Sequence, residues 1–185
     1  FTVGGEVIDA RGYLQDARSS VRTSDVNVLE PIQAYAAYKF AGPFGGATAI
    51  TAGRWTIDIG ASRLVSRVDF PNTVPSYLGA KLDWTTKEKD RLVAFWGKPF
   101  QALPEAIGDI RDNAFELDRA GGNVTFYGIS GTKANAIGKA SLEAYTYRLA
   151  EDDRGTRATR NRRLVTSGSR LFLAPAKGRF DYEVE

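Results

Sequence analysis

Charged side chains that could hold an anion gather between Thr51 and Leu82, where they alternate with apolar residues. Three arginines and one lysine supply the cations, and two aspartates lie among them in the sequence. Guanidinium groups bind carboxylates and other oxyanions through paired hydrogen bonds, so the aspartates could hold the arginines in place while the set attracts a solute. The candidate solute-binding residues are Arg54, Asp58, Arg63, Arg67, Asp69 and Lys81.

The composition excludes several kinds of chemistry. The 185 residues include no Cys and no His, which excludes disulfides, Ser-His or Cys-His catalysis and zinc fingers. Carboxylate pairs such as Asp152 and Asp153 stand without any other catalytic motif, and no phosphate-binding loop is present. The net charge of only +3 does not indicate a nucleic-acid partner. The sequence therefore predicts a protein that is not an enzyme, with no cofactor, no metal site and no nucleic-acid partner.

The dominant hydrophobic period along the chain is two, the period of a β-strand with two different faces. It is clearest in residues 32–40, 78–84, 92–96, 124–129 and 142–147. Gly, Pro, Asn and charged residues separate these runs, and the connections alternate between short and long. We expect an all-β fold, an antiparallel up-and-down meander of about nine or ten strands. Residues 104–110 could form a short helix within a long connection.

The alternation of apolar and polar residues fits two kinds of β-protein. No run approaches the ~20 apolar residues of a transmembrane helix, but a membrane β-barrel needs only ~9–11 residues per strand. Many aromatic residues fall near the ends of the expected strands, and Ala and Gly are frequent on the apolar faces. Aromatic residues near strand ends fit the interfacial girdle of a membrane barrel, and they fit a β-core equally well. The small residues favour the barrel, because lipid tolerates them, whereas a two-layer core needs larger side chains to fill its volume. The alternative is a soluble all-β module, a lipocalin-like barrel or a sandwich, that binds carbohydrate or another ligand.

Specific residues resemble the alginate export family of bacterial outer-membrane proteins. The resemblance is carried by Gly53-Arg54, Gly60, Arg63-Leu64-Val65-x-Arg67-x-Asp69-Phe70-x-Asn72 and Ser76-Tyr77-x-Gly79-x-Lys81-Leu82. It implies a transmembrane β-barrel in the outer membrane, surrounded by lipid, whose charged lumen passes an anionic polysaccharide or a smaller anionic solute. Because family barrels are more than twice as long, residues 1–185 are interpreted as a single partial barrel domain, an internal fragment of a porin-like chain.

This reading predicts directions for individual side chains. The cations Arg54, Arg63, Arg67 and Lys81 should point to the concave side of the sheet, with Asp58 or Asp69 beside an arginine. The convex, lipid-facing side should carry Leu78, Ala80, Leu82, Leu92 and Trp96. Residues 2–8 and 180–185 should be the edges of an open sheet. The soluble alternative reverses these directions, since its concave interior must be apolar.

Overall fold

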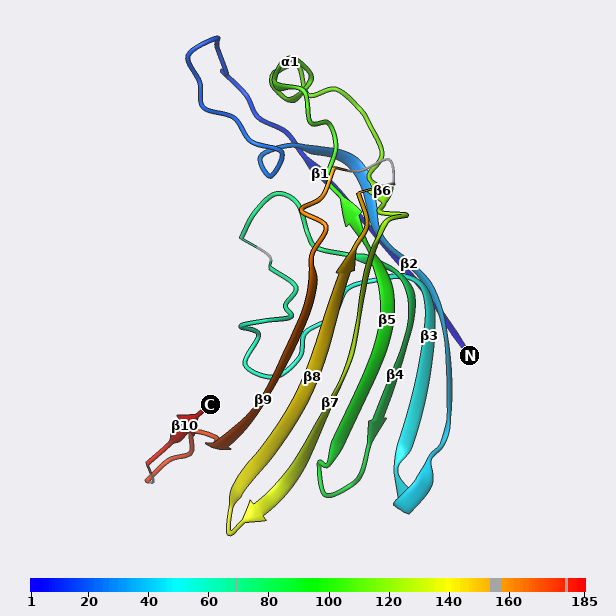
Figure 1. Ribbon diagram of the computed structural model, residues 1–185, viewed down its shortest axis with the longest axis vertical. Helices are drawn as coiled ribbons and strands as arrows, with labels where there is room; N and C mark the ends of the chain where they lie inside the picture. The colour runs from blue at the N-terminus through cyan, green and yellow to red at the C-terminus, as the bar shows by residue number, and fades with distance from the viewer. Residues whose placement is uncertain (69, 154–157, 179) are drawn as a thin grey trace.

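The protein forms one antiparallel sheet of ten strands, in a computed structural model that describes residues 1–68, 70–153, 158–178 and 180–185 (Figure 1). The strands follow one another in chain order as a meander, and the short β6 pairs with β5 beside this path. The all-β fold class is confirmed. The strands are β1 (Thr2–Ala10), β2 (Asn27–Ala41), β3 (Ala47–Trp55), β4 (Tyr77–Thr85), β5 (Arg91–Gln101), β6 (Arg119–Ala120), β7 (Val124–Ile137), β8 (Ala140–Glu151), β9 (Arg163–Leu173) and β10 (Tyr182–Val184).

The connections differ at the two ends of the sheet (Figure 1). Short turns at residues 42–46, 86–90 and 138–139 join the strands at one end, which we call the short-turn end. Long connections leave the other end, the long-loop end, after β1, β3, β5 and β8. One of them contains the helix α1 (Ile107–Arg111), which overlaps the predicted helical segment, and a short turn holds the 3-10 helix η1 (Pro43–Gly45). No helix in the described part of the chain has the length and apolar character needed to cross a membrane.

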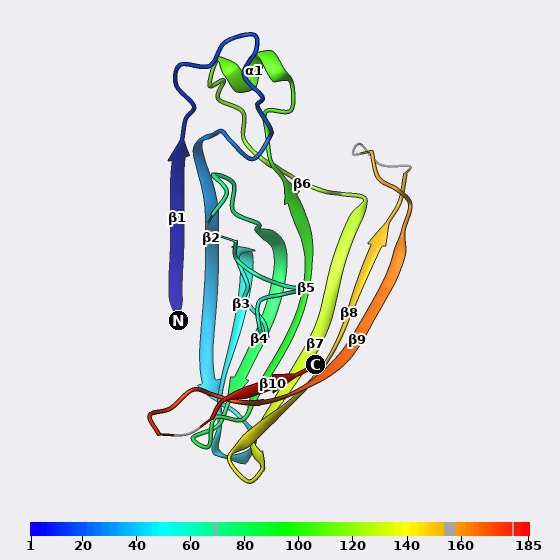
Figure 2. The same ribbon diagram turned by 90° about the vertical axis from the view of Figure 1, so that its left-hand side faces the viewer.

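The sheet bends into a trough with a concave and a convex face (Figures 1 and 2). Residues 56–76 and β10 lie on the concave side, in front of the strands as seen in Figure 2. Among the described strands β1 and β10 stand at opposite ends of the strand order, so the sheet is open. The two segments predicted to be edges are the edges.

The alternation between Thr51 and Leu82 predicts that the charged residues there belong to strands, and this is wrong for part of the segment. Strand β3 ends at Trp55 and β4 begins at Tyr77, so Asp58, Arg63 and Arg67 lie in a connection and not in the sheet. Pro71 and Pro75 have no N–H to donate to a ladder, which disfavours a central strand there. Ile57, Ile59 and Val65 of the connection are apolar for another reason, which is that they pack against the sheet, whereas Leu64, Val68 and Phe70 are exposed.

An aromatic cluster on the concave face holds this connection in place. Ile57, Ile59 and Val65 from the connection are buried against Trp55, Val93, Phe95 and Tyr147 of the strands. The Trp55 ring stacks on Tyr77 with ring centres 5.3 Å apart, and meets Phe95 edge-on at 6.3 Å. Such ring pairs add specific geometry to the burial of apolar area. The described part of this connection, residues 56–68 and 70–76, is therefore held on the concave face by Ile57, Ile59 and Val65.

Glycines let the Trp55 ring lie close to the sheet. A Cβ atom at Gly97 would stand 3.2 Å from that ring. Gly53, two residues before Trp55, has a φ of +121°, and a Cβ there would come within 2.4 Å of the Ala34 carbonyl oxygen. A side chain at Gly97 would push the Trp55 ring away from the sheet, and a side chain at Gly53 would push β2 away from β3. The two glycines therefore permit the close packing of Trp55 against the sheet.

The strand register assigns the remaining side chains to faces, because directly paired residues share a face. Lys81 pairs with Phe95, and Phe95 with Gly128, so Lys81 lies on the concave face with the aromatic cluster. Leu82, Ala94 and Ile129 form the neighbouring row on the convex face. The residues predicted to be convex, Leu78, Ala80, Leu82, Leu92 and Trp96, all lie on that face.

The polarity of the two faces gives a first prediction. The resemblance predicts lipid on the convex side, so Ile129→Arg should lower the free energy of unfolding in lipid vesicles by ~2–4 kcal/mol. Thr166, exposed on the concave face of β9 opposite Tyr147, is the control. Thr166→Arg should change stability by less than about 1 kcal/mol because its cation stays hydrated. Urea unfolding of both variants measures the difference, and equal costs would contradict a lipid-facing convex side.

Candidate functional site: the charged concave face

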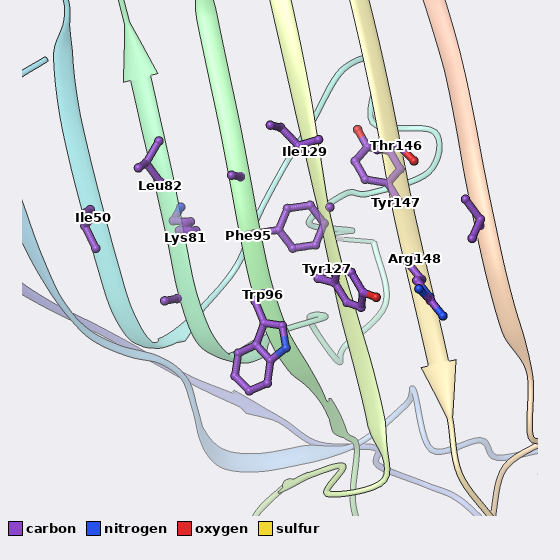
Figure 3. Close-up of a pocket in the computed structure, with 14 residues that line it drawn as sticks. Ile50, Lys81, Leu82, Phe95, Trp96, Tyr127, Ile129, Thr146, Tyr147 and Arg148 are labelled. Carbon is purple, nitrogen blue, oxygen red and sulfur yellow. The ribbon is translucent and has the colours of Figure 1, made fainter. Parts of the chain in front are cut away.

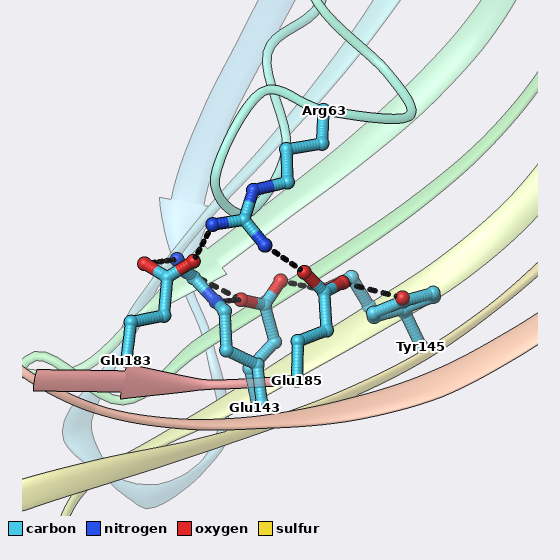
Figure 4. A network of polar contacts seen from close by, with 7 residues as sticks. Arg63, Glu143, Tyr145, Glu183 and Glu185 are labelled. Atoms are coloured by element: carbon cyan, nitrogen blue, oxygen red, sulfur yellow. Dashed lines mark hydrogen bonds and ion pairs between the residues drawn. The ribbon is translucent and has the colours of Figure 1, made fainter.

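A group of charged and polar side chains on the concave side joins Arg63 of the connection after β3 to the last four strands (Figure 4). We call it the Arg63 network. Its members are Arg63, Ser130, Glu143, Tyr145, Arg170, Glu183 and Glu185.

Arg63 is the exposed end of this network, with 61% of its side chain accessible. Its Nη2 lies 2.7 Å from Glu183 Oε1 and its Nη1 lies 2.9 Å from Glu185 Oε2. Tyr145 donates its hydroxyl to the other oxygen of Glu185 at 2.6 Å. Arg63 therefore bridges two carboxylates while its guanidinium stays open to solvent.

The inner end of the network is buried. Arg170 donates to Glu143 Oε2 through Nη2 at 2.7 Å and to Glu183 through Nη1 at 3.0 Å. Ser130 donates its hydroxyl to the second oxygen of Glu143 at 2.8 Å. Only 2% of the Glu143 side chain is accessible, so these bonds satisfy a charge that would otherwise be buried alone. The connection approaches at Gly60, whose φ is +66°, where a Cβ would stand 2.9 Å from Glu143 Oε1.

Arg67 anchors the same connection to the opposite edge of the sheet. Its two terminal nitrogens donate to the two oxygens of Glu6 on β1, at 2.7 and 2.6 Å. Gln33 on β2 also donates to Glu6, at 2.6 Å. The backbone N–H of Arg67 donates to Asp58 at 2.6 Å. The bidentate pair fixes the guanidinium in direction, and Asp58 fixes the backbone that carries it.

Lys81 lies between these two anchors, on β4. Its ammonium group stands 3.8 Å from Asp83 Oδ2 and 5.9 Å from the centre of the Trp55 ring. About a fifth of the side chain is accessible. The ring face and the carboxylate both attract a cation, so Lys81 is held over the aromatic cluster.

Arg54 lies in a separate, buried cluster at the long-loop end. It is a register partner of Leu78, so the strand alternation places it on the convex face, opposite Trp55, and the prediction that Arg54 points to the concave side is wrong. It forms an ion pair with Glu30, donates to Asp118 at 3.0 Å and to Ser76 at 2.9 Å, and covers the Phe100 ring at 3.7 Å. Only 7% of its side chain is accessible. These partners close Arg54 off from solvent.

Asp118 belongs to the connection between α1 and β6, and is part of the Arg54 cluster. Burial raises the pKa of Asp118 above its ordinary value, even though the Leu103 N–H and Arg54 both stabilise its charged form. The Asp118 N–H in turn donates to Glu30 at 3.1 Å. The cluster thus ties a long connection to β2 and β3 through one arginine and two acids.

The structure brings together some of the residues expected to form the site. Arg67 and Asp58 are hydrogen-bonded, whereas Arg54, Arg63 and Lys81 each have different partners. Asp69 lies outside the described residues. Sequence reasoning missed the acids that pair with the arginines. The sequence did contain a signal for some of these acids. In residues 142–147 and 180–185 the period-two alternation places the glutamates on the face opposite the apolar residues. These missed partners are Glu6, Glu30, Asp118, Glu143, Glu183 and Glu185.

Three candidate cations of the concave side share one property, which is that they are paired and yet accessible to solvent. Arg63, Arg67 and Lys81 are partly accessible, and each stands beside a carboxylate that a solute anion would have to replace. Exposed ion pairs contribute ~0–1 kcal/mol, so such an exchange costs little at Arg63, the most accessible of the three. The described residues contain no group of three or more acids placed to hold a metal ion.

Comparison with known proteins identifies one family. A family model described as alginate export matches residues 3–185, nearly the whole chain. No curated protein matches the sequence, and no solved structure matches the fold.

The Arg54 cluster gives a prediction for stability. Arg54→Met leaves Glu30 and Asp118 buried without a cation, so the free energy of unfolding should fall by about 3–5 kcal/mol. The triple variant R54M/E30Q/D118N should recover most of this loss, because no buried charge remains. Urea unfolding in lipid vesicles measures both values.

The stability of the R54M variant should depend on pH. A carboxyl group with a raised pKa in the folded state favours folding in its protonated form, and this contribution is lost as the pH rises. R54M should therefore regain stability when the pH is lowered from 7 to 5. Adding D118N should reduce that gain. A pH response unaffected by D118N would exclude Asp118 as its source.

Proposed function

The chain belongs to the alginate export family of bacterial outer-membrane β-barrel proteins, which transport polysaccharide, and from this premise we propose that an anionic solute passes along the concave face of its sheet. The solute class we propose is an anionic polysaccharide such as alginate, or a smaller anion. In this proposal the protein performs transport, and its selectivity comes from the charges and width of the passage.

The different polarity of the two faces supports a route for the solute along the concave face. Paired acids and cations lie on the concave side, and Leu78, Leu82, Trp96 and Ile129 are apolar residues of the convex face. A cation on the lipid face costs ~2–4 kcal/mol at the midplane of the bilayer, whereas a lumen cation stays hydrated. We propose that the open sheet is one part of a larger barrel wall, with its concave face toward the lumen.

One observation carries the proposal: the cations of the concave face form ion pairs with acids and are still accessible to solvent. A channel must bind its solute strongly enough to admit it and weakly enough to release it. Arg63 holds two glutamates at hydrogen-bond distance while most of its side chain is accessible. A carboxylate of a passing polyanion could take the place of Glu183 or Glu185 and then leave again, with Arg67 and Lys81 as further sites along the trough.

The other candidate residues have supporting roles in this proposal. Asp58 holds the backbone of the connection at Arg67, so it positions a solute-binding residue. Arg54 is enclosed by Glu30 and Asp118, so it stabilises the long-loop end and does not contact the solute.

The proposal predicts the ion selectivity of the channel. In planar bilayers, the full-length protein with Arg63→Ser and Arg67→Ser should show an anion-over-cation permeability ratio reduced by about twofold or more, because local anion concentration follows the fixed charge. Reversal potentials in a salt gradient measure the ratio. Lys133→Ser is the charge control, since Lys133 pairs with Asp90 at the short-turn end, away from the Arg63 network.

A second control separates charge from movement of the connection. Glu183→Gln weakens the same contact with Arg63 but removes a negative charge, so the anion preference should rise. If both changes moved the ratio in the same direction, displacement of residues 56–76 would be the cause. An unchanged ratio in R63S/R67S would remove these residues from the selectivity filter.

A further inference from the structure

The convex face carries an apolar groove that the transport proposal does not use (Figure 3). Its volume is about 730 Å³, and it runs across the middle strands of the sheet. Leu82, Ala94 and Ile129 are paired across β4, β5 and β7 and form one row of its lining. Trp96, Tyr127 and Arg148 form the next row toward the long-loop end. The small side chain of Ala94 lies between the larger side chains of Leu82 and Ile129 in this row.

Cations lie at the long-loop end of this groove. Arg148 pairs with Val165 across β8 and β9, and Arg163 stands two residues before Val165 on the same face. Diagonal neighbours of this kind have Cβ atoms about 7–8 Å apart. Lys98 shares the face through its pairing with Leu78. Within the described part of the chain, neither Arg148 nor Arg163 makes a side-chain hydrogen bond or an ion pair.

Two unpaired arginines beside an apolar groove require an anionic partner that also has an apolar part. A second copy packed through the same face is a poor candidate, because it would bring arginine against arginine. The strand acids Glu6, Asp83 and Glu143 lie on the concave side, and Glu30 is enclosed by Arg54, so none of these four acids offers such a copy a partner. A lipid with a phosphorylated headgroup meets both requirements, since guanidinium groups bind phosphate in a bidentate manner.

The two ends of the sheet indicate which leaflet of the outer membrane the groove would face. Outer-membrane barrels have short periplasmic turns and longer extracellular loops, and Arg148 and Arg163 lie toward the long-loop end. Trp96 and Tyr127 lie beside Arg148, and such aromatic side chains prefer the boundary between lipid and water. The groove below them then lies in the acyl region of the outer leaflet.

We propose that Arg148, Arg163 and the convex groove form a binding site for a phosphorylated glycolipid of the outer leaflet. The two guanidinium groups hold a headgroup phosphate, Trp96 and Tyr127 border the headgroup, and an acyl chain occupies the groove along Ala94 and Ile129. The inference rests on the outer-membrane location of the family and not on the solute that the channel passes.

Lipid titration of the full-length protein tests the site. The detergent-solubilised protein is titrated with bisphosphorylated lipid A, with its dephosphorylated form and with phosphatidylglycerol, and bound lipid is counted by native mass spectrometry. The wild type should retain the bisphosphorylated lipid in preference to the other two. Arg148→Ser and Arg163→Ser should each weaken this binding by about tenfold, as expected for a lost hydrogen bond between charged groups.

Matched variants make the outcome decisive. Lys133→Ser removes a cation near the short-turn end and should leave lipid binding unchanged. Arg148→Lys keeps the charge without the bidentate geometry and should bind with intermediate affinity, which also covers the case in which R148S does not fold. Equal binding by the wild type and both serine variants would overturn the proposal. So would equal retention of the dephosphorylated lipid or phosphatidylglycerol, or a lipid-free dimer that R148S dissociates.

Because the readout is retained lipid and not ion flow, failure of this test leaves passage along the concave face untouched. Loss of anion selectivity in R63S/R67S likewise says nothing about the convex groove.

Discussion

The packing of residues 56–76 against the concave aromatic cluster is the contact on which the arrangement of the charged groups depends. Ile57, Ile59 and Val65 bury their side chains against Trp55, Phe95 and Tyr147. This burial holds the connection on the sheet and brings Arg63 and Arg67 to strands that are distant in sequence. Without it, the two arginines would extend from a free loop, and their acidic partners Glu6 on β1 and Glu183 on β10 would face an open trough.

The ion-paired arginines then differ in how far they are exposed to solvent. Arg54 and Arg170 are buried, and each is held by two carboxylates, because an unpaired charge away from water is strongly unfavourable. Arg63 makes the same kind of contacts in solvent, where they are weak enough to exchange. One residue type therefore stabilises the fold where it is enclosed and offers a replaceable anion site where it is exposed.

The two faces of the sheet use cations in opposite settings. On the concave side each candidate cation stands beside an acid of the same chain, which suits brief contact with a passing polyanion. On the convex side Arg148 and Arg163 have no such acid within the described residues, and the surface around them is apolar. If bilayer lipid surrounds that face, as proposed, the partner that neutralises these arginines comes from the membrane.

The sequence by itself determined the strands and their order. Period-two alternation decides which residues can form a two-faced strand, and the Gly-, Pro- and charge-rich breaks decide where neighbours join, so the antiparallel meander and the convex residues followed from local pattern. Tertiary structure alone decided that residues 56–76 leave the sheet, because alternating apolar residues serve a packed layer as well as a strand. It also decided the partners of the arginines. Arg67 meets Glu6 across 61 residues and Arg63 meets Glu185 across 122, and such pairs form only after the sheet has bent and the aromatic cluster has drawn the connection onto its concave face.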